Sequence, residues 1–222
     1  MTVILILLMV SVFVTLDYAF GRKSAETVTA DNPDGFLPLA AEPVWVAGYQ
    51  LPEELRFHPG HTWVRPLSAD TVVVGIDDFA RRLTGPATSI GLPEAGSRLA
   101  AGRPAFRIGT AGGGADLVSP LSGEVLEVNP RLGEQPGLAT DEPYGRGWLV
   151  KLKSHDLASG LRNLMGGSLA RRWTEDARAR LDMQLVALSG SVLQDGGEPV
   201  ADFAQHLNDE DWRRLVQEFL LS

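Results

Sequence analysis

Cysteine is absent from the 222 residues of this chain. Disulfide bonds, thiolate nucleophiles, cysteine-ligated zinc and iron–sulfur clusters are therefore excluded. Lysine is nearly as scarce, with three residues (Lys23, Lys151 and Lys153) against 17 arginines. Basic residues are outnumbered by acidic ones, so the formal net charge is -8 and the pI is about 5.0. A phosphate backbone demands a basic surface, so this balance argues against nucleic acid as a partner.

The remaining composition is that of a folded protein. Apolar residues make up 44% of the chain and charged residues 22%, which is typical of globular proteins and not of disordered ones. A chain of this length holds one domain with appendages or two small domains.

The amino-terminal segment predicts a transmembrane anchor over residues 1–21. Residues 2–20 are almost wholly apolar, and as a helix they would span ~28 Å, close to the hydrocarbon thickness of a bilayer. The residues expected to contact lipid are Val3, Leu7, Phe13, Tyr18 and Phe20. Because Arg22 and Lys23 follow the run directly, the positive-inside rule places the rest of the chain in the cytoplasm, on a single-pass protein of the inner (cytoplasmic) membrane.

A cleaved signal peptide is the main alternative for this segment. The residues Ala19-Phe20-Gly21 form a passable cleavage site with small residues at the required positions. However, no basic residue precedes the apolar run, and the run is long for a signal core. We therefore expect a retained anchor. A buried core helix fits poorly with so uniform an apolar segment.

Composition divides the rest of the chain into three parts. Residues 22–50 are expected to form an extended tether, with a turn signal at Asn32–Gly35. Within it, the apolar piece around Trp45 is expected either to pack on the chain's own domain or to contact a partner. Residues 51–183 form the main domain, and residues 184–222 a loop followed by an amphipathic helix.

The main domain is predicted to be mainly β. Thr71–Ile76 is a β-branched run typical of a strand, and further short strands are expected up to Lys153, separated by glycine and proline. Asp77–Leu83 switches to helical spacing and ends at Gly85. Many short strands with such turns favour a sandwich or flattened barrel.

Helices are predicted beyond residue 154. One has Leu157, Leu161, Leu164 and Met165 on a single face. Ser168 is expected to cap a longer helix whose apolar face runs at steps of four. That face is formed by Leu169, Trp173, Ala177, Leu181 and Leu185.

The last helix is expected to open at Asn208 or Asp209. Its apolar stripe includes Trp212 and Phe219. Packing on the core is the default explanation for such a stripe, and contact with a partner's groove is the alternative.

Six short motifs resemble the glycine cleavage system H protein, and they occur in that family's order. They are Leu55–Val64 (LRFHPGHTWV), Val74–Ala80 (VGIDDFA), Ile90–Gly96 (IGLPEAG), the hairpin segment Arg103–Val118, Ser119–Val125 (SPLSGEV), and a final turn and strand made of the pieces Asn129–Leu132, Pro136–Leu138 and Glu142–Leu149. The resemblance covers roughly residues 51–181. It implies a lipoyl/biotinyl-type β-sandwich (barrel-sandwich hybrid) with carboxyl-terminal helices.

The resemblance fails at the residue that defines the family's activity. Family members carry lipoate on a lysine that projects from a hairpin turn, and the position that matches it here is Gly112, within Gly112-Gly113-Gly114. Glycine has no side chain to acylate. None of the three lysines lies in the hairpin segment, so no lipoyl cofactor and no other cofactor is expected.

Other chemistry finds little support in the sequence. The glycine-rich run is followed by Leu117–Pro120, which reads as a strand, whereas a phosphate cradle needs a helix there. His58 and His61 are separated by Pro59-Gly60, which prevents a helical metal-ligand pair, so surface or capping roles are expected and no metal. No recognisable catalytic motif is present, and we expect a protein that is not an enzyme.

Two functions remain open. The first is a non-catalytic, membrane-anchored H-protein-like scaffold or accessory subunit of a larger membrane complex, such as a respiratory or photosynthetic one. Its partners would be the lipid bilayer and protein subunits, with Trp45, Trp212 and Phe219 as contact residues, and no small-molecule ligand is expected. The alternative is a protein that binds lipoate non-covalently or regulates glycine cleavage or one-carbon metabolism, with the triglycine leaving room for a ligand.

Overall fold

The computed structural model describes residues 44–189 and 207–221. The predicted anchor with Val3, Leu7, Phe13, Tyr18 and Phe20, and residues 22–43 of the predicted tether, lie outside the described residues. Among the described residues, no helix combines the length and the apolar character that a membrane span requires.

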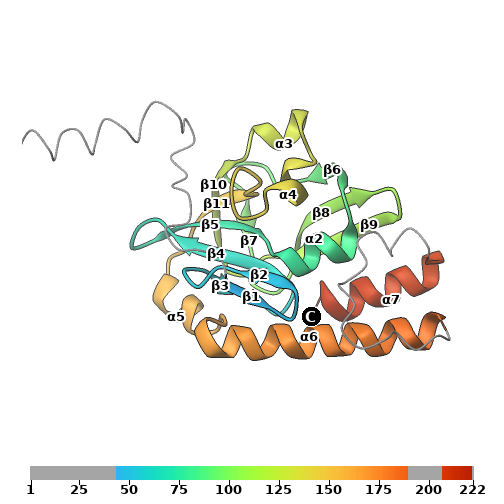
Figure 1. The fold of residues 1–222 in the computed structure, drawn as a ribbon. Helices are drawn as coiled ribbons and strands as arrows, with labels where there is room; N and C mark the ends of the chain where they lie inside the picture. Colours follow the sequence, from blue (N-terminus) through green and yellow to red (C-terminus); the bar gives the residue numbers. More distant parts are fainter. Residues whose placement is uncertain (1–43, 190–206, 222) are drawn as a thin grey trace, which may run out of the picture. The chain divides into compact units, whose positions relative to one another are not determined.

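Eleven short strands form the body of the described chain (Figure 1). The larger sheet has six strands in the order β3-β4-β5-β11-β10-β7, and every pair in it is antiparallel. Its strands are β3 (Arg56–Phe57), β4 (Thr62–Pro66), β5 (Thr71–Ile76), β11 (Val150–Lys153), β10 (Gly123–Val128) and β7 (Arg98–Leu99).

A second sheet has three antiparallel strands in the order β6-β8-β9. These are β6 (Ala87–Gly91), β8 (Pro104–Thr110) and β9 (Gly113–Val118). Buried side chains from both sheets, including Val74, Leu152, Phe106 and Leu117, belong to one continuous core. The prediction of a mainly β sandwich with carboxyl-terminal helices is confirmed.

A close cross-strand contact joins the neighbouring strands β4 and β5 of the larger sheet. Trp63 faces Gly75 in the antiparallel register, and the indole is fully buried. A Cβ on residue 75 would lie 2.4 Å from Cζ2 of Trp63, so only glycine leaves room for the ring. The indole Nε1 donates to the carbonyl of Pro143 at 3.1 Å, which ties the sheet to the loop before β11.

Short helices connect the strands. Helix α2 (Asp78–Thr84) begins at its N-cap Asp77, whose side chain accepts a hydrogen bond from the amide of Ala80, and ends at Gly85. This matches the predicted helix, because an acidic cap and a glycine with positive φ (74°) give local start and stop signals. Two single-turn helices, α3 (Arg131–Glu134) and α4 (Leu138–Asp141), precede β11.

The predicted tether needs correction at its end. Strands β1 (Val44–Val46) and β2 (Tyr49–Leu51) form a hairpin, where an extended tether was predicted. Tyr49 is buried and its ring lies 5.1 Å from that of Phe79 in α2. The described domain therefore begins at least seven residues before the predicted boundary at residue 51.

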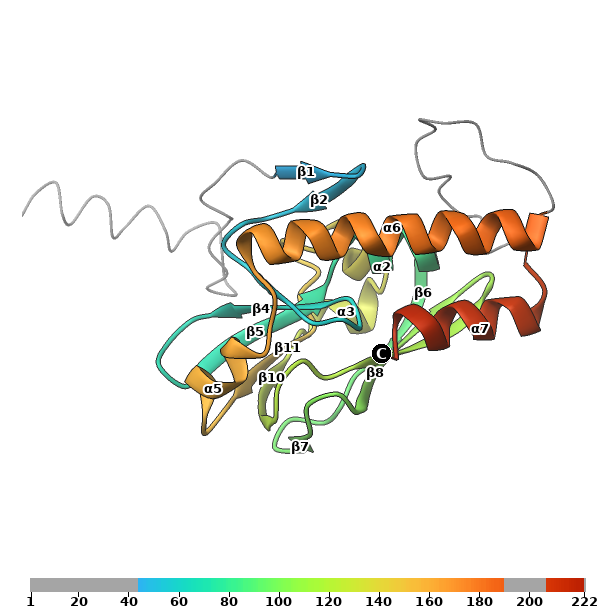
Figure 2. The same cartoon turned by 90° about the horizontal axis from the view of Figure 1, so that it is seen from below.

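Three helices follow the strands: α5 (Leu157–Arg162), α6 (Gly167–Ser189) and α7 (Asp209–Phe219). Figure 2 shows α6 and α7 side by side along one side of the sheets. Helix α6 begins one residue before the predicted cap Ser168. Leu169 is 59% exposed, contrary to the predicted face, because a strict step of four drifts around a helix of 3.6 residues per turn. The buried face instead uses Ala170, Thr174, Ala177 and Leu181.

Candidate functional site

The hairpin β8–β9 closes in a two-residue turn. Thr110 pairs with Gly113, so Ala111 and Gly112 alone form the tip. Gly113 and Gly114 belong to strand β9, and the Thr110 hydroxyl donates to the carbonyl of Gly113 at 2.9 Å. Gly113 has a φ of 132°, a conformation that favours glycine. Of the three glycines, Gly112 therefore lies in the turn, and Gly113 and Gly114 lie in the strand.

The tip offers no side chain that could carry an acyl group. Gly112 is half-buried, and the segment Pro104–Val118 contains no lysine. Lys151 and Lys153 lie on β11 in the larger sheet, where Nζ of Lys151 is 2.7 Å from Glu127 and Nζ of Lys153 is 3.5 Å from Asp70. Lys23 lies outside the described residues.

Helix α7 packs on this hairpin. The indole Nε1 of Trp212 donates to the carbonyl of Gly114 at 3.3 Å. Trp212 and Phe219 are 3% and 2% exposed, so the prediction that they contact a partner is corrected: both belong to the chain's own core. The apolar face of α7, which includes both residues, packs on the sandwich because this contact removes it from water.

Trp45 is the member of the predicted contact set that remains accessible. Its side chain is 60% exposed on β1. The guanidinium of Arg82 lies 6.0 Å from its ring centroid, at the outer limit of a cation–π contact. This indole is the largest exposed aromatic surface among the described residues.

The motif around His61 forms a buried polar pair that the sequence did not reveal. His61 is 1% exposed, and its Nδ1 lies 2.7 Å from Oδ2 of Asp77. Its ring stacks on Phe79 at 4.0 Å between centroids and is 4.5 Å from Trp173. The expected surface or capping role is therefore wrong for His61, since aromatic residues of α2 and α6 cover it.

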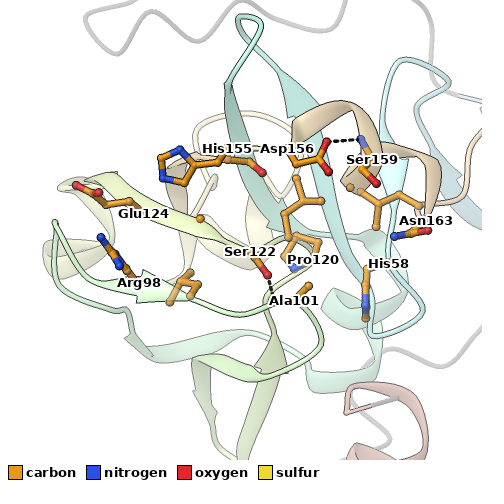
Figure 3. Close-up of a pocket in the computed structure, with 16 residues that line it drawn as sticks. His58, Arg98, Ala101, Pro120, Ser122, Glu124, His155, Asp156, Ser159 and Asn163 are labelled. Atoms are coloured by element: carbon orange, nitrogen blue, oxygen red, sulfur yellow. Dashed lines mark hydrogen bonds between the residues drawn. The ribbon is translucent and has the colours of Figure 1, made fainter.

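A pocket of about 590 Å³ is lined on one side by His58 (Figure 3). Its walls come from the edge strand β7, the loop that leads into β10, the segment before α5 and α5 itself. Its polar lining includes His58, Arg98, Ser122, Glu124, Ser154, His155, Asp156, Ser159 and Asn163.

The polar groups of this pocket mainly serve the backbone. The Asp156 carboxylate accepts from the amide of Ser159 as the cap of α5, and the Ser122 hydroxyl accepts from the amide of Ala101. Burial, and then the proximity of His61, lower the pKa of His58 below its ordinary value, and its Nδ1 accepts from the amide of Gly60 at 3.0 Å. In the described part of the chain, no hydrogen bond joins a serine to a histidine here, and no cluster of three metal-ligating side chains is found.

The order of these elements agrees with a known family. The model of the glycine cleavage H-protein family matches residues 55–177, more than half of the chain. The chain belongs to the glycine cleavage H-protein family. The matched residues run from the turn before β3 to the middle of α6, and they include the hairpin β8–β9 and the His61–Asp77 pair. Helix α7 lies beyond them.

Individual H proteins show the same extent of similarity. The glycine cleavage system H protein of Marinobacter nauticus is 36% identical over 107 residues, covering 48% of this chain and 82% of that protein. The one from Escherichia coli O7:K1 is 34% identical over 126 residues, 57% of this chain and 97% of that protein. A crystal structure of a glycine cleavage system H protein from Mycobacterium marinum aligns with a TM-score of 0.44 and 29% identity, over 47% of this chain and 87% of that one.

Proposed function

We propose that this H-protein family member is a non-lipoylated, membrane-anchored scaffold or accessory subunit of a larger membrane complex. The observation that carries the proposal is the hairpin tip, where the motif order supports matching Gly112 to the family's lipoyl position. With no lysine in Pro104–Val118, the tip cannot form the amide bond that attaches lipoate. The sandwich that would present the arm is nevertheless intact, which favours a role in protein contact.

Two further features support attachment to a membrane assembly. The apolar run at residues 2–20 is long enough to span a bilayer, and the basic residues after it favour a domain in the cytoplasm. Trp45, near the start of the described domain, presents a large exposed indole, a residue type enriched at the centre of interfaces. We take Trp45 as the contact residue and the host as a respiratory or photosynthetic complex.

Absence of lipoylation is tested by intact mass. The full chain is produced together with lipoylating enzymes and lipoate, beside the Escherichia coli H protein as a positive control. We expect the unmodified mass for this chain and the lipoyl mass for the control. A lipoyl adduct on any lysine of this chain overturns the proposal.

The scaffold role is tested by extraction from membranes in mild detergent. The wild-type chain should co-purify with defined subunits, and Trp45→Ala should release them. Met183→Ala is the matched control, because that side chain is 65% exposed on α6 and apolar. A chain that is native in the soluble fraction without partners contradicts the role. Heat released on titration with lipoate would instead support the non-covalent lipoate-binding alternative.

A further inference from the structure

Helix α7 runs beside strand β9 and approaches it near both of its ends. At its start, Trp212 contacts Gly113 and Gly114 next to the tip. At its end, the carbonyl of Leu220 lies against Gly60, beside Val118 at the end of β9. The eight residue steps from Trp212 to Leu220 span ~12 Å of helix, whereas the six residues of β9 span ~17 Å of strand. Figure 2 shows α7 beside the hairpin, with α6 next to it.

The Trp212 ring packs against the glycines at the start of β9. A Cβ on Gly113 would lie 2.9 Å from Nε1 and 3.0 Å from Cδ1 of Trp212, closer than a real side chain tolerates. The indole can therefore approach the strand only because residue 113 has no side chain. The triglycine therefore has a second structural consequence besides the absence of a lysine, because it allows α7 to pack closely on the hairpin.

The other end of α7 is held by the core and by α6. Phe219 is 2% exposed, and its ring lies 5.3 Å from that of Phe79. The guanidinium of Arg180 lies 5.4 Å from the Phe219 ring, and the amide of Gln184 donates to Glu218 at 2.9 Å. Contacts at both ends hold α7 against the hairpin and the core.

We propose that α7 is a releasable mask of the hairpin β8–β9, that is, a helix of the same chain that covers the hairpin when docked and exposes it when it detaches. The docked helix covers the start of β9 next to the tip, so a protein that would bind this part of the hairpin can do so only after α7 leaves. The mask is a second block, separate from the missing lysine, and it does not depend on the scaffold proposal. Partners that bind while α7 is docked must use other faces, such as the one around Trp45.

The test restores an acceptor and asks whether an enzyme can reach it. Gly112→Lys is made in the full chain and incubated with a purified lipoate–protein ligase, lipoate and ATP, and the rate of lipoylation is followed by intact mass. The same rate is measured for Gly112→Lys combined with Trp212→Ala. Gly112→Lys combined with Gln217→Ala is the control, since Gln217 is exposed on α7.

We expect Gly112→Lys and its Gln217→Ala control to react at least about 10-fold more slowly than the Trp212→Ala combination, because a site available only in a minor open state reacts in proportion to that state's population. Equal rates in all three overturn the mask. The outcome is independent of the mass test on the unsubstituted chain, so the two proposals can fail separately.

Hydrogen exchange on the unsubstituted chain keeps the proposal testable if Trp212→Ala unfolds the domain. A releasable mask predicts that the amides of 212–220 open before those of β4 and β5, in a sub-global step. If α7 exchanges only together with the whole domain, the helix is a permanent part of the core and the proposal is wrong.

Discussion

His61 and Asp77 are joined twice, once through side chains and once through the backbone. The imidazole Nδ1 lies 2.7 Å from the Asp77 carboxylate, and the amide of Asp77 donates to the carbonyl of His61 at 3.1 Å. An ionised carboxylate only accepts, so Nδ1 carries the shared hydrogen. The pair links the turn before β4 to the start of α2. It also holds His61 at a φ of 58°, which is unfavourable for a residue with a side chain.

Asp77→Ala should destabilise the domain by about 2–4 kcal/mol. It removes the cap of α2, worth about 1 kcal/mol, and leaves the buried Nδ1–H without an acceptor, which costs about 1–3 kcal/mol. Asp77→Asn should lose less, because its oxygen can still cap. Urea unfolding of the full chain measures both. Asp209→Ala, an exposed first-turn residue of α7, is the control, and equal losses for Asp77→Ala and Asp209→Ala would contradict this account.

Gly75→Ala tests the contact with Trp63. The added methyl must displace a fully buried indole, and such overpacking typically costs about 1–3 kcal/mol of unfolding free energy. Gly133→Ala is the matched control, because a Cβ there meets nothing within 4 Å, and its effect should stay within about 1 kcal/mol. A Gly75→Ala protein as stable as the wild type would show that the ring can move aside.

His58 should make the domain less stable as the pH falls. Burial lowers the pKa of His58 in the folded state below its ordinary value of 6.5, so near that pH the unfolded chain binds the proton more readily than the folded one. The stability linked to His58 is therefore complete above pH 6.5 and is lost as the pH falls through that value. His58→Asn should show a smaller decrease in unfolding free energy between pH 7.5 and pH 5.5.

His155→Asn is the control for this pH dependence, since His155 is exposed. It should keep the wild-type pH profile. If His58→Asn and the wild type lose stability in parallel, the linkage to His58 is absent.

Local signals made much of the fold predictable. Helix α2 carries both its cap and its stop in the sequence, and β5 is a run of β-branched residues. The motifs located the hairpin, but they did not show that Gly113 and Gly114 belong to a strand, because glycine weakens a strand pattern and their pairing depends on β8. The hairpin β1–β2 was missed for a similar reason: two three-residue strands carry too little pattern of their own.

The candidate site divides in the same way. The sequence by itself determined that no thiol chemistry occurs, that the hairpin has no lysine, and that the motifs follow the H-protein order, because these depend on which residues are present and on their order. Only the tertiary structure decided that His61 is buried against Asp77, that Trp212 packs on the hairpin and that Phe219 packs beside Phe79. These contacts join residues far apart in the chain. An amphipathic pattern predicts that one face of a helix is buried, but it does not identify the surface on which that face packs.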